Sequence, residues 1–260
     1  MRFAIMISVI IFLVACNAMV GNSSDRKIPE NLQVAKINVQ LGMAYLERNH
    51  LQRAKQKLLM ALNQAPQLPE AWYSMAYFLE ASGNKEEAKN YYQKAIALAP
   101  GRGDAENNYG TFLCRNKNYE LAIKHFELAT KDLRYLDSAG AFENAGLCAL
   151  KIPDQNRALA YFQLALKQDH DRPSTLLKVA NLYDQQGAYP LAQNYLHHFL
   201  QVASPNKQSN LLSKHLAKMM AKNSSSHHDL NMKQAFLQPP AIKNKVPLAF
   251  QSHRNELMRP

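Results

Sequence analysis

The most reactive side chains of this 260-residue chain are three thiols, Cys16, Cys114 and Cys148. A thiol can be acylated, oxidised to a disulfide or bound to a metal ion. Histidine offers little support for a metal site, because the pairs His197-His198 and His227-His228 are adjacent and would diverge on a helix. The chain has no glycine-rich phosphate loop, nucleophile elbow or HExxH pattern. The sequence therefore predicts a protein that is not an enzyme, with no cofactor, no metal site and no small-molecule substrate.

Cys16 ends a short apolar segment at the start of the chain. Arg2 is followed by an almost unbroken apolar run from residue 3 to residue 15, too short for a membrane span of about 20 residues but typical of a signal peptide. Its end, Leu13-Val14-Ala15-Cys16, resembles a bacterial lipobox, in which cleavage precedes a cysteine that becomes thioether-linked to a diacylglyceryl group. The resemblance predicts a signal peptide over 1–15 and a lipid anchor on Cys16. Asn17, where an aspartate would favour the inner membrane, implies the outer membrane, facing the periplasm. A core helix is the alternative.

A repeated pattern must position the other two cysteines. Alanine, a leucine or aromatic residue four positions later, and a small or apolar residue three further recur at intervals of 34, 34, 36 and 34 residues. This period is typical of a two-helix solenoid unit. The five matches are Ala54/Leu58/Ala61, Ala88/Tyr92/Ala95, Ala122/Phe126/Ala129, Ala158/Phe162/Ala165 and Ala192/Leu196/Phe199.

The period divides the chain into predicted segments. A lipidated polar linker spans 16–34, five repeats span 35–206, and a degenerate sixth spans 207–238. A basic tail, expected to be disordered, covers 239–260. Within the repeats, Gly42, Gly110 and Gly146 are expected to let paired helices approach closely, while large aromatic residues fill the space between repeats.

These positions resemble the tetratricopeptide repeat. Its pattern of Trp, Leu-Gly, Tyr, Ala, Phe, Ala and Pro over 34 residues has counterparts in Trp72, Leu41-Gly42, Tyr45 and Pro100. The resemblance implies an all-α fold, a right-handed superhelix of five clear repeats plus a degenerate sixth. First helices of consecutive repeats would then lie side by side. A disulfide between Cys114 and Cys148 is geometrically possible in an oxidising periplasm, and two buried free thiols are the alternative.

Three segments extend the resemblance to one family. Residues 107–114, the two-residue expansion around Arg134-Tyr135 and residues 142–149 resemble the type IV pilus biogenesis/stability lipoproteins of the PilF/PilW type. Members of that family are outer-membrane tetratricopeptide lipoproteins that act as pilotins for the secretin pore or as pilus-stability factors. The resemblance covers roughly residues 13–222 and implies a secretin subunit as the protein partner.

First helices of such repeats line a groove. The positions that face it in the first two repeats give an apolar and aromatic stretch, which is typical of a peptide or helix site. The linker at 17–34 or a tightly curled superhelix could instead cover it. A clamp for a C-terminal carboxylate is not predicted, because lysine is missing from the fifth position of each repeat. The candidate groove residues are Val39, Met43, Leu46, Tyr73 and Tyr77.

The chain carries a net positive charge, which bears on the kind of partner that it could bind. Lysine and arginine total 31 against 20 acidic residues, a formal charge of +11, which is compatible with nucleic acid, an anionic membrane or an acidic partner. Nucleic acid is not predicted as a partner, because no aromatic-basic motif of a nucleic-acid module accompanies the charge.

Together, the repeats, the lipobox and the family resemblance favour a pilotin. A general periplasmic scaffold for cell-wall enzymes or outer-membrane assembly factors is the alternative.

Overall fold

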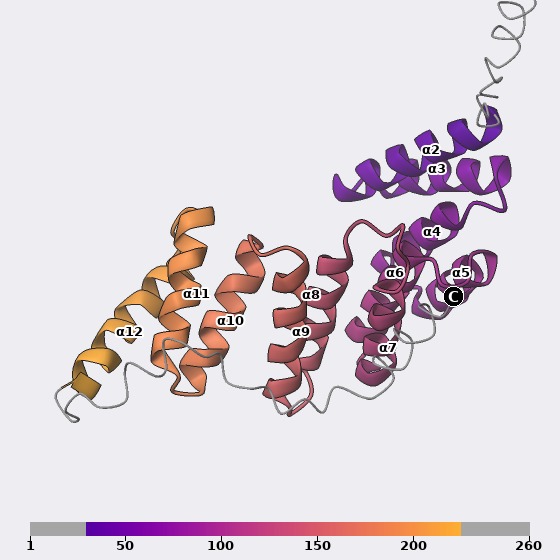
Figure 1. The fold of residues 1–260 in the computed structure, drawn as a ribbon. Coiled ribbons are helices and arrows are strands. Elements are labelled where there is room, and N and C mark those ends of the chain that lie inside the picture. The colour runs from indigo at the N-terminus through magenta and orange to yellow at the C-terminus, as the bar shows by residue number, and fades with distance from the viewer. Residues whose placement is uncertain (1–29, 225–260) are drawn as a thin grey trace, which may run out of the picture. The chain divides into compact units, whose positions relative to one another are not determined.

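Every regular element in the described part of the chain, residues 30–224, is an α-helix in the computed structural model (Figure 1). The predicted all-α class is therefore confirmed. The signal peptide, Cys16, most of the linker and residues 225–260 lie outside the described residues. The helices are α2 (Glu30–Glu47), α3 (Leu51–Gln64), α4 (Pro69–Ala81), α5 (Lys85–Leu98), α6 (Gly103–Arg115), α7 (Tyr119–Ala129), α8 (Ser138–Ala149), α9 (Gln155–Gln168), α10 (Pro173–Gln185), α11 (Tyr189–Val202) and α12 (Lys207–Ser224).

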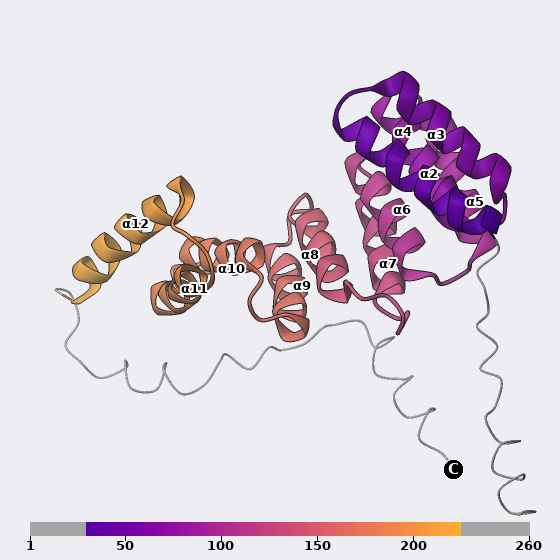
Figure 2. The same cartoon turned by 90° about the horizontal axis from the view of Figure 1, so that it is seen from above.

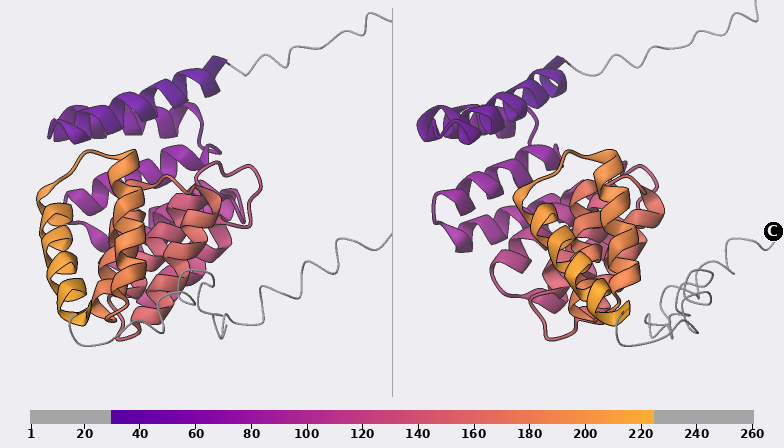
Figure 3. Two further views of the ribbon diagram at one scale, coloured as in Figure 1. Left: turned by 60° about the vertical axis from the view of Figure 1, so that its left-hand side comes forward. Right: turned by 90° about the vertical axis from the view of Figure 1, so that its left-hand side faces the viewer.

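The chain divides into two compact units within α10, the first ending at Val179 and the second beginning at Ala180. In the first unit the helices form pairs, α2 with α3 through α8 with α9, and the first helices of successive pairs contact one another in series (Figures 1 and 2). In the second unit α11 packs against α12 (Figure 3). Helix α2 begins at Glu30, inside the range assigned to the linker, and the fifth repeat, α10 and α11, spans the boundary between units.

Paired helices approach each other closely at glycines, as the sequence predicts. A Cβ atom on Gly110 would lie 2.9 Å from Cε1 of Phe126, and one on Gly146 would lie 2.7 Å from Cε1 of Phe162. Both rings are almost completely buried. Because a real Cβ atom does not come this near to another heavy atom, the side chain of the second helix occupies the space that the glycine leaves.

Aromatic side chains join one repeat to the next. The ring of Tyr92, on α5, lies 5.1 Å from that of Phe112 and 5.9 Å from that of Tyr109, both on α6 of the following repeat. Tyr92 is almost fully buried, and this burial raises the pKa of its phenol well above the ordinary value. The side chain thus acts as a core residue between repeats.

The turn inside each of the first three repeats contains one residue in the left-handed region. These residues are Asn49 (φ 58°), Gly83 (φ 86°) and Lys117 (φ 66°). The corresponding residue of the fourth repeat is Pro153, whose ring excludes a positive φ. There the turn ends instead at Asp154, whose Oδ1 accepts a hydrogen bond of 3.1 Å from the backbone N–H of Arg157 and so caps α9.

We predict that Gly146→Ala destabilises the first unit. The new methyl group would overlap the ring of Phe162, and overpacking costs about 1–3 kcal/mol, which exceeds the gain of up to ~1 kcal/mol from removing a helical glycine. Urea denaturation should show a free energy of unfolding lower by about 1 kcal/mol. In a Phe162→Leu background, which provides space, the same substitution should cost nothing. Equal costs in both backgrounds would contradict the close-packing argument.

Candidate functional site in the groove of the first repeats

Tyr73 lies on α4, where it faces the first helix of the next repeat. Its hydroxyl group is 3.2 Å from Oδ2 of Asp104, on α6, and donates a hydrogen bond to it. Burial, followed by the nearby carboxylates of Asp104 and Glu70, raises the pKa of Tyr73 well above the ordinary value of a tyrosine. Tyr73 therefore stays neutral and acts as a hydrogen-bond donor that links two repeats.

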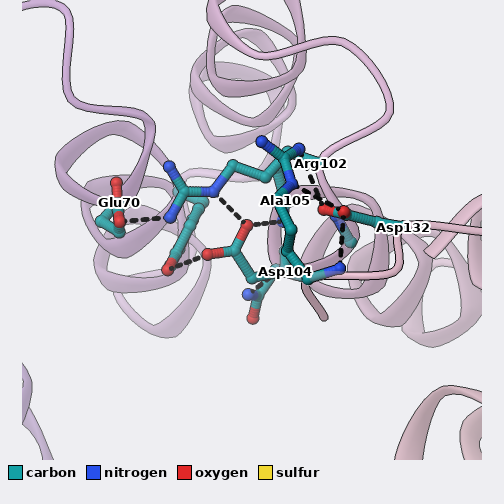
Figure 4. Close-up of polar contacts among 9 residues, drawn as sticks. Glu70, Arg102, Asp104, Ala105 and Asp132 are labelled. Atoms are coloured by element: carbon teal, nitrogen blue, oxygen red, sulfur yellow. Dashed lines mark hydrogen bonds and ion pairs between the residues drawn. The ribbon is translucent and has the colours of Figure 1, made fainter. Parts of the chain in front are cut away.

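An arginine network holds the same edge of the groove (Figure 4). The guanidinium group of Arg102 donates to Glu70, in the first turn of α4, and, through Nε, to Oδ1 of Asp104 at 2.8 Å. On the other side, Oδ2 of Asp132 accepts a hydrogen bond of 3.0 Å from the backbone N–H of Gly103, at the start of α6. These contacts fix the start of α6 against both the preceding repeat and the following loop.

Tyr77, one turn after Tyr73, is 39% exposed but does not present a free ring. The guanidinium carbon of Arg115 lies 5.7 Å from its centroid, a cation–π contact. Arg115 also binds both carboxylate oxygens of Glu80, at 2.7 and 2.5 Å. A partner at this position would therefore meet a cation and an aromatic edge together.

The three other predicted groove residues lie on α2, which packs beside α4. Val39, Met43 and Leu46 are half-buried, as is Tyr73. The structure thus brings the five predicted residues onto two neighbouring helices and leaves each partly accessible. That a partner binds them stays a prediction.

A second apolar face of α2 was not predicted from the sequence. Val34, Ile37 and Leu41 are 37%, 47% and 41% exposed and follow one another at i, i+3 and i+7, so they form one stripe. This stripe lies about half a turn away from Val39 and Met43. The three residues have helical spacing in the sequence, but Val34 falls within the predicted linker.

The loop between α7 and α8 also exposes apolar side chains that the sequence analysis did not single out. Leu133 and Leu136 are each 99% exposed. Between them Tyr135 turns inward against Gly103, where an added Cβ would lie 2.4 Å from Cβ of Tyr135. Burial and nearby Asp137 raise the pKa of Tyr135 to about 12. Tyr135 lies in the segment that holds the two extra residues of the 36-residue interval.

Cys114 and Cys148 are paired as a disulfide that joins α6 to α8. Their Cα atoms are 5.8 Å apart, within the normal range for a bridge. Beside it, the side-chain amide of Asn144 donates a hydrogen bond of 3.0 Å to Oδ1 of Asn107 on the same two helices. That the protein carries this disulfide in the cell stays a prediction.

Between residues 30 and 224, no group of three histidine, cysteine or acidic side chains is placed to hold a metal ion. Nε2 of His197 lies 3.1 Å from Nε2 of Gln201. His227 and His228 lie outside the described residues. None of the helices in this stretch is both long and apolar enough to cross a membrane.

The paired helices are those of a tetratricopeptide-repeat protein, and residues 69–102 match the tetratricopeptide repeat family. The solved structure of PilF from Pseudomonas aeruginosa superposes with a TM-score of 0.67 and 30% identity, covering 75% of this chain and 88% of that one. PilW, described as a widely conserved type IV pilus biogenesis factor, gives a TM-score of 0.63 with 24% identity over 75% of this chain and 89% of PilW. At that identity PilW supports the fold alone.

Sequence relatives identify the family. PilF of Pseudomonas aeruginosa, a type IV pilus assembly protein, is 31% identical over 199 residues, which cover 76% of this chain and 79% of PilF. An uncharacterized protein of Haemophilus influenzae is 35% identical over 143 residues, which cover 55% of this chain and 79% of that protein. The chain therefore belongs to the family of type IV pilus biogenesis proteins that includes PilF, and the predicted family is confirmed.

We predict that Cys114 and Cys148 are oxidised to a disulfide in the natural protein. Mass spectrometry of unreduced protein after thiol alkylation should find neither residue modified, and alkylation of both would contradict the pairing. Because the bridge closes a loop with a sequence separation of 34 residues, replacing both cysteines by serine should lower the free energy of unfolding by about 2–4 kcal/mol. Adding a reductant should destabilise the natural protein but not the double variant.

Proposed function

We propose that this protein is a pilotin, an outer-membrane lipoprotein that promotes secretin localisation or multimerisation and so serves type IV pilus biogenesis or stability. The observation that carries the proposal is the similarity to PilF over 199 residues. The protein acts by binding other proteins rather than by catalysis. Cys16 carries the lipid anchor, and the repeats face the periplasm.

The first repeat is the surface that receives the secretin subunit. Helix α2 offers two partly accessible apolar faces, the predicted groove face with Val39 and Met43 and the outer stripe Val34/Ile37/Leu41. The outer stripe is the more exposed of the two, and exposed apolar patches of this kind mark partner sites. Two apolar faces on one helix support binding by an amphipathic helix or a sheet edge of the partner.

The anchor is tested by Cys16→Ala. The variant should be exported but not acylated, and without a membrane anchor it should leave secretin protomers unassembled or in the inner membrane. Membrane fractionation with gels that preserve secretin multimers measures both outcomes, and an immunoblot shows whether the variant accumulates. Normal outer-membrane multimers alongside an abundant variant would overturn the proposal.

The binding face is tested by two matched double variants of α2. Ile37→Gln with Leu41→Gln alters the outer stripe, and Val39→Gln with Met43→Gln alters the groove face. Loss of the apolar contact in the first pair should weaken secretin capture at least 10-fold, since burying one such side chain contributes about 1.5–3 kcal/mol. The second pair should have the smaller effect. Pull-down with the purified secretin subunit, and circular dichroism for folding, provide the measurements.

Two results would speak against this arrangement. If the outer-stripe double variant still captures secretin and the groove-face double variant does not, the binding site lies in the predicted groove. Recovery of cell-wall hydrolases or synthases without secretin would favour the general periplasmic scaffold instead.

A further inference from the structure

Helix α12, in the second unit, presents a cationic face to solvent. Lys207, Leu211, Lys214 and Lys218 follow one another at i, i+4, i+7 and i+11, so they lie on one side of the helix. The three lysines are exposed, and Leu211 is 60% exposed among them. We call these four residues the lysine face. The opposite side of α12, with Ser209, Leu212 and Leu216, is buried, and Figure 3 shows α12 in yellow beside α11.

The lysine face is not balanced by acidic side chains. No aspartate or glutamate occurs between Asp184 and Asp229. Within residues 180–224, Asp184 is thus the single carboxylate, and it is largely buried with its Oδ1 3.3 Å from Nε2 of His215. The first unit is built differently, because Arg157, for example, binds both oxygens of Glu120 at 2.8 and 2.9 Å. Residues 180–224 therefore carry a net positive charge.

We propose that the lysine face binds the surface of a phospholipid bilayer that contains anionic headgroups. Lysine ammonium groups are compact, strongly hydrated charges that bind phosphates without a fixed geometry. The row extends for about 16 Å along a straight helix, and Leu211 in its middle can enter the headgroup region, as in interfacial amphipathic helices. A specific acidic protein would gain more from the paired donors of arginine, and α12 has none. This contact does not depend on secretin binding.

The test uses the unacylated chain from Asn17 to Pro260, which retains every described helix. Flotation with vesicles rich in phosphatidylglycerol should recover the protein, and vesicles of phosphatidylcholine should not. Replacing Lys207, Lys214 and Lys218 by glutamine should lower vesicle affinity about 100-fold, at roughly fivefold per lysine. The matched control replaces exposed Lys85, Lys89 and Lys124 of the first unit by glutamine, which changes the net charge equally, and it should bind almost as well as the natural chain.

A single substitution tests the contribution of Leu211 to vesicle binding. Leu211→Ser should lower affinity about 10-fold, and this loss should persist when salt weakens the lysine contribution. Circular dichroism should show every variant folded, since the altered side chains are exposed. Unchanged vesicle binding by the triple variant, an equal loss in the matched control, or equally tight binding to phosphatidylcholine would overturn the proposal. So would binding of poly-glutamate without vesicle binding, which would identify an acidic protein as the partner.

Discussion

The close approach of paired helices at small residues is the constraint on which the rest of this structure depends. At Gly42, Gly110 and Gly146 the second helix places a leucine or phenylalanine where a Cβ atom would otherwise be. Each pair then becomes a compact block whose outer faces must be covered, and the next repeat covers them. The 34-residue period follows from this requirement, because each block must offer the next one the same surface.

Charged contacts between successive first helices then determine where the groove remains apolar. Arg115, on α6, binds Glu80, on α4, and Arg172, just before α10, binds Glu143, on α8, at 2.9 Å. Such pairs contribute modestly to stability where they are exposed, but they place polar groups between neighbouring first helices. Helix α2 instead keeps apolar side chains such as Ile37 and Leu41 exposed. This exposure is the reason for proposing the partner site in the first repeat.

Sequence periodicity was enough to predict the helices, because they depend on spacing within a regular array. The same spacing predicts that Cys114 and Cys148 lie on neighbouring first helices, and the structure places them there. Local backbone conformations in the turns and loops could be predicted less well from the sequence. Gly83 adopts the left-handed conformation that glycine favours, whereas Lys117 adopts the same conformation with a side chain that gives no such signal in the sequence. The contact of Tyr135 with Gly103, 32 residues apart in the chain, could not be predicted from the spacing either. The exposure of Ile37 depends on which face of α2 is left uncovered by α3 and α4, and the spacing of apolar residues alone does not predict that face.

The first and last described helices differ in the side chains that they expose. A helix with one uncovered face in a repeat array usually carries polar side chains there. Helix α12 exposes Lys207, Lys214 and Lys218, with Leu211 among them. Helix α2 instead exposes the apolar side chains of Val34, Ile37 and Leu41. Leaving about three apolar side chains in water costs several kcal/mol relative to burying them. Covering them with the apolar surface of a partner would recover this free energy, which is why the proposed partner site includes the outer stripe of α2.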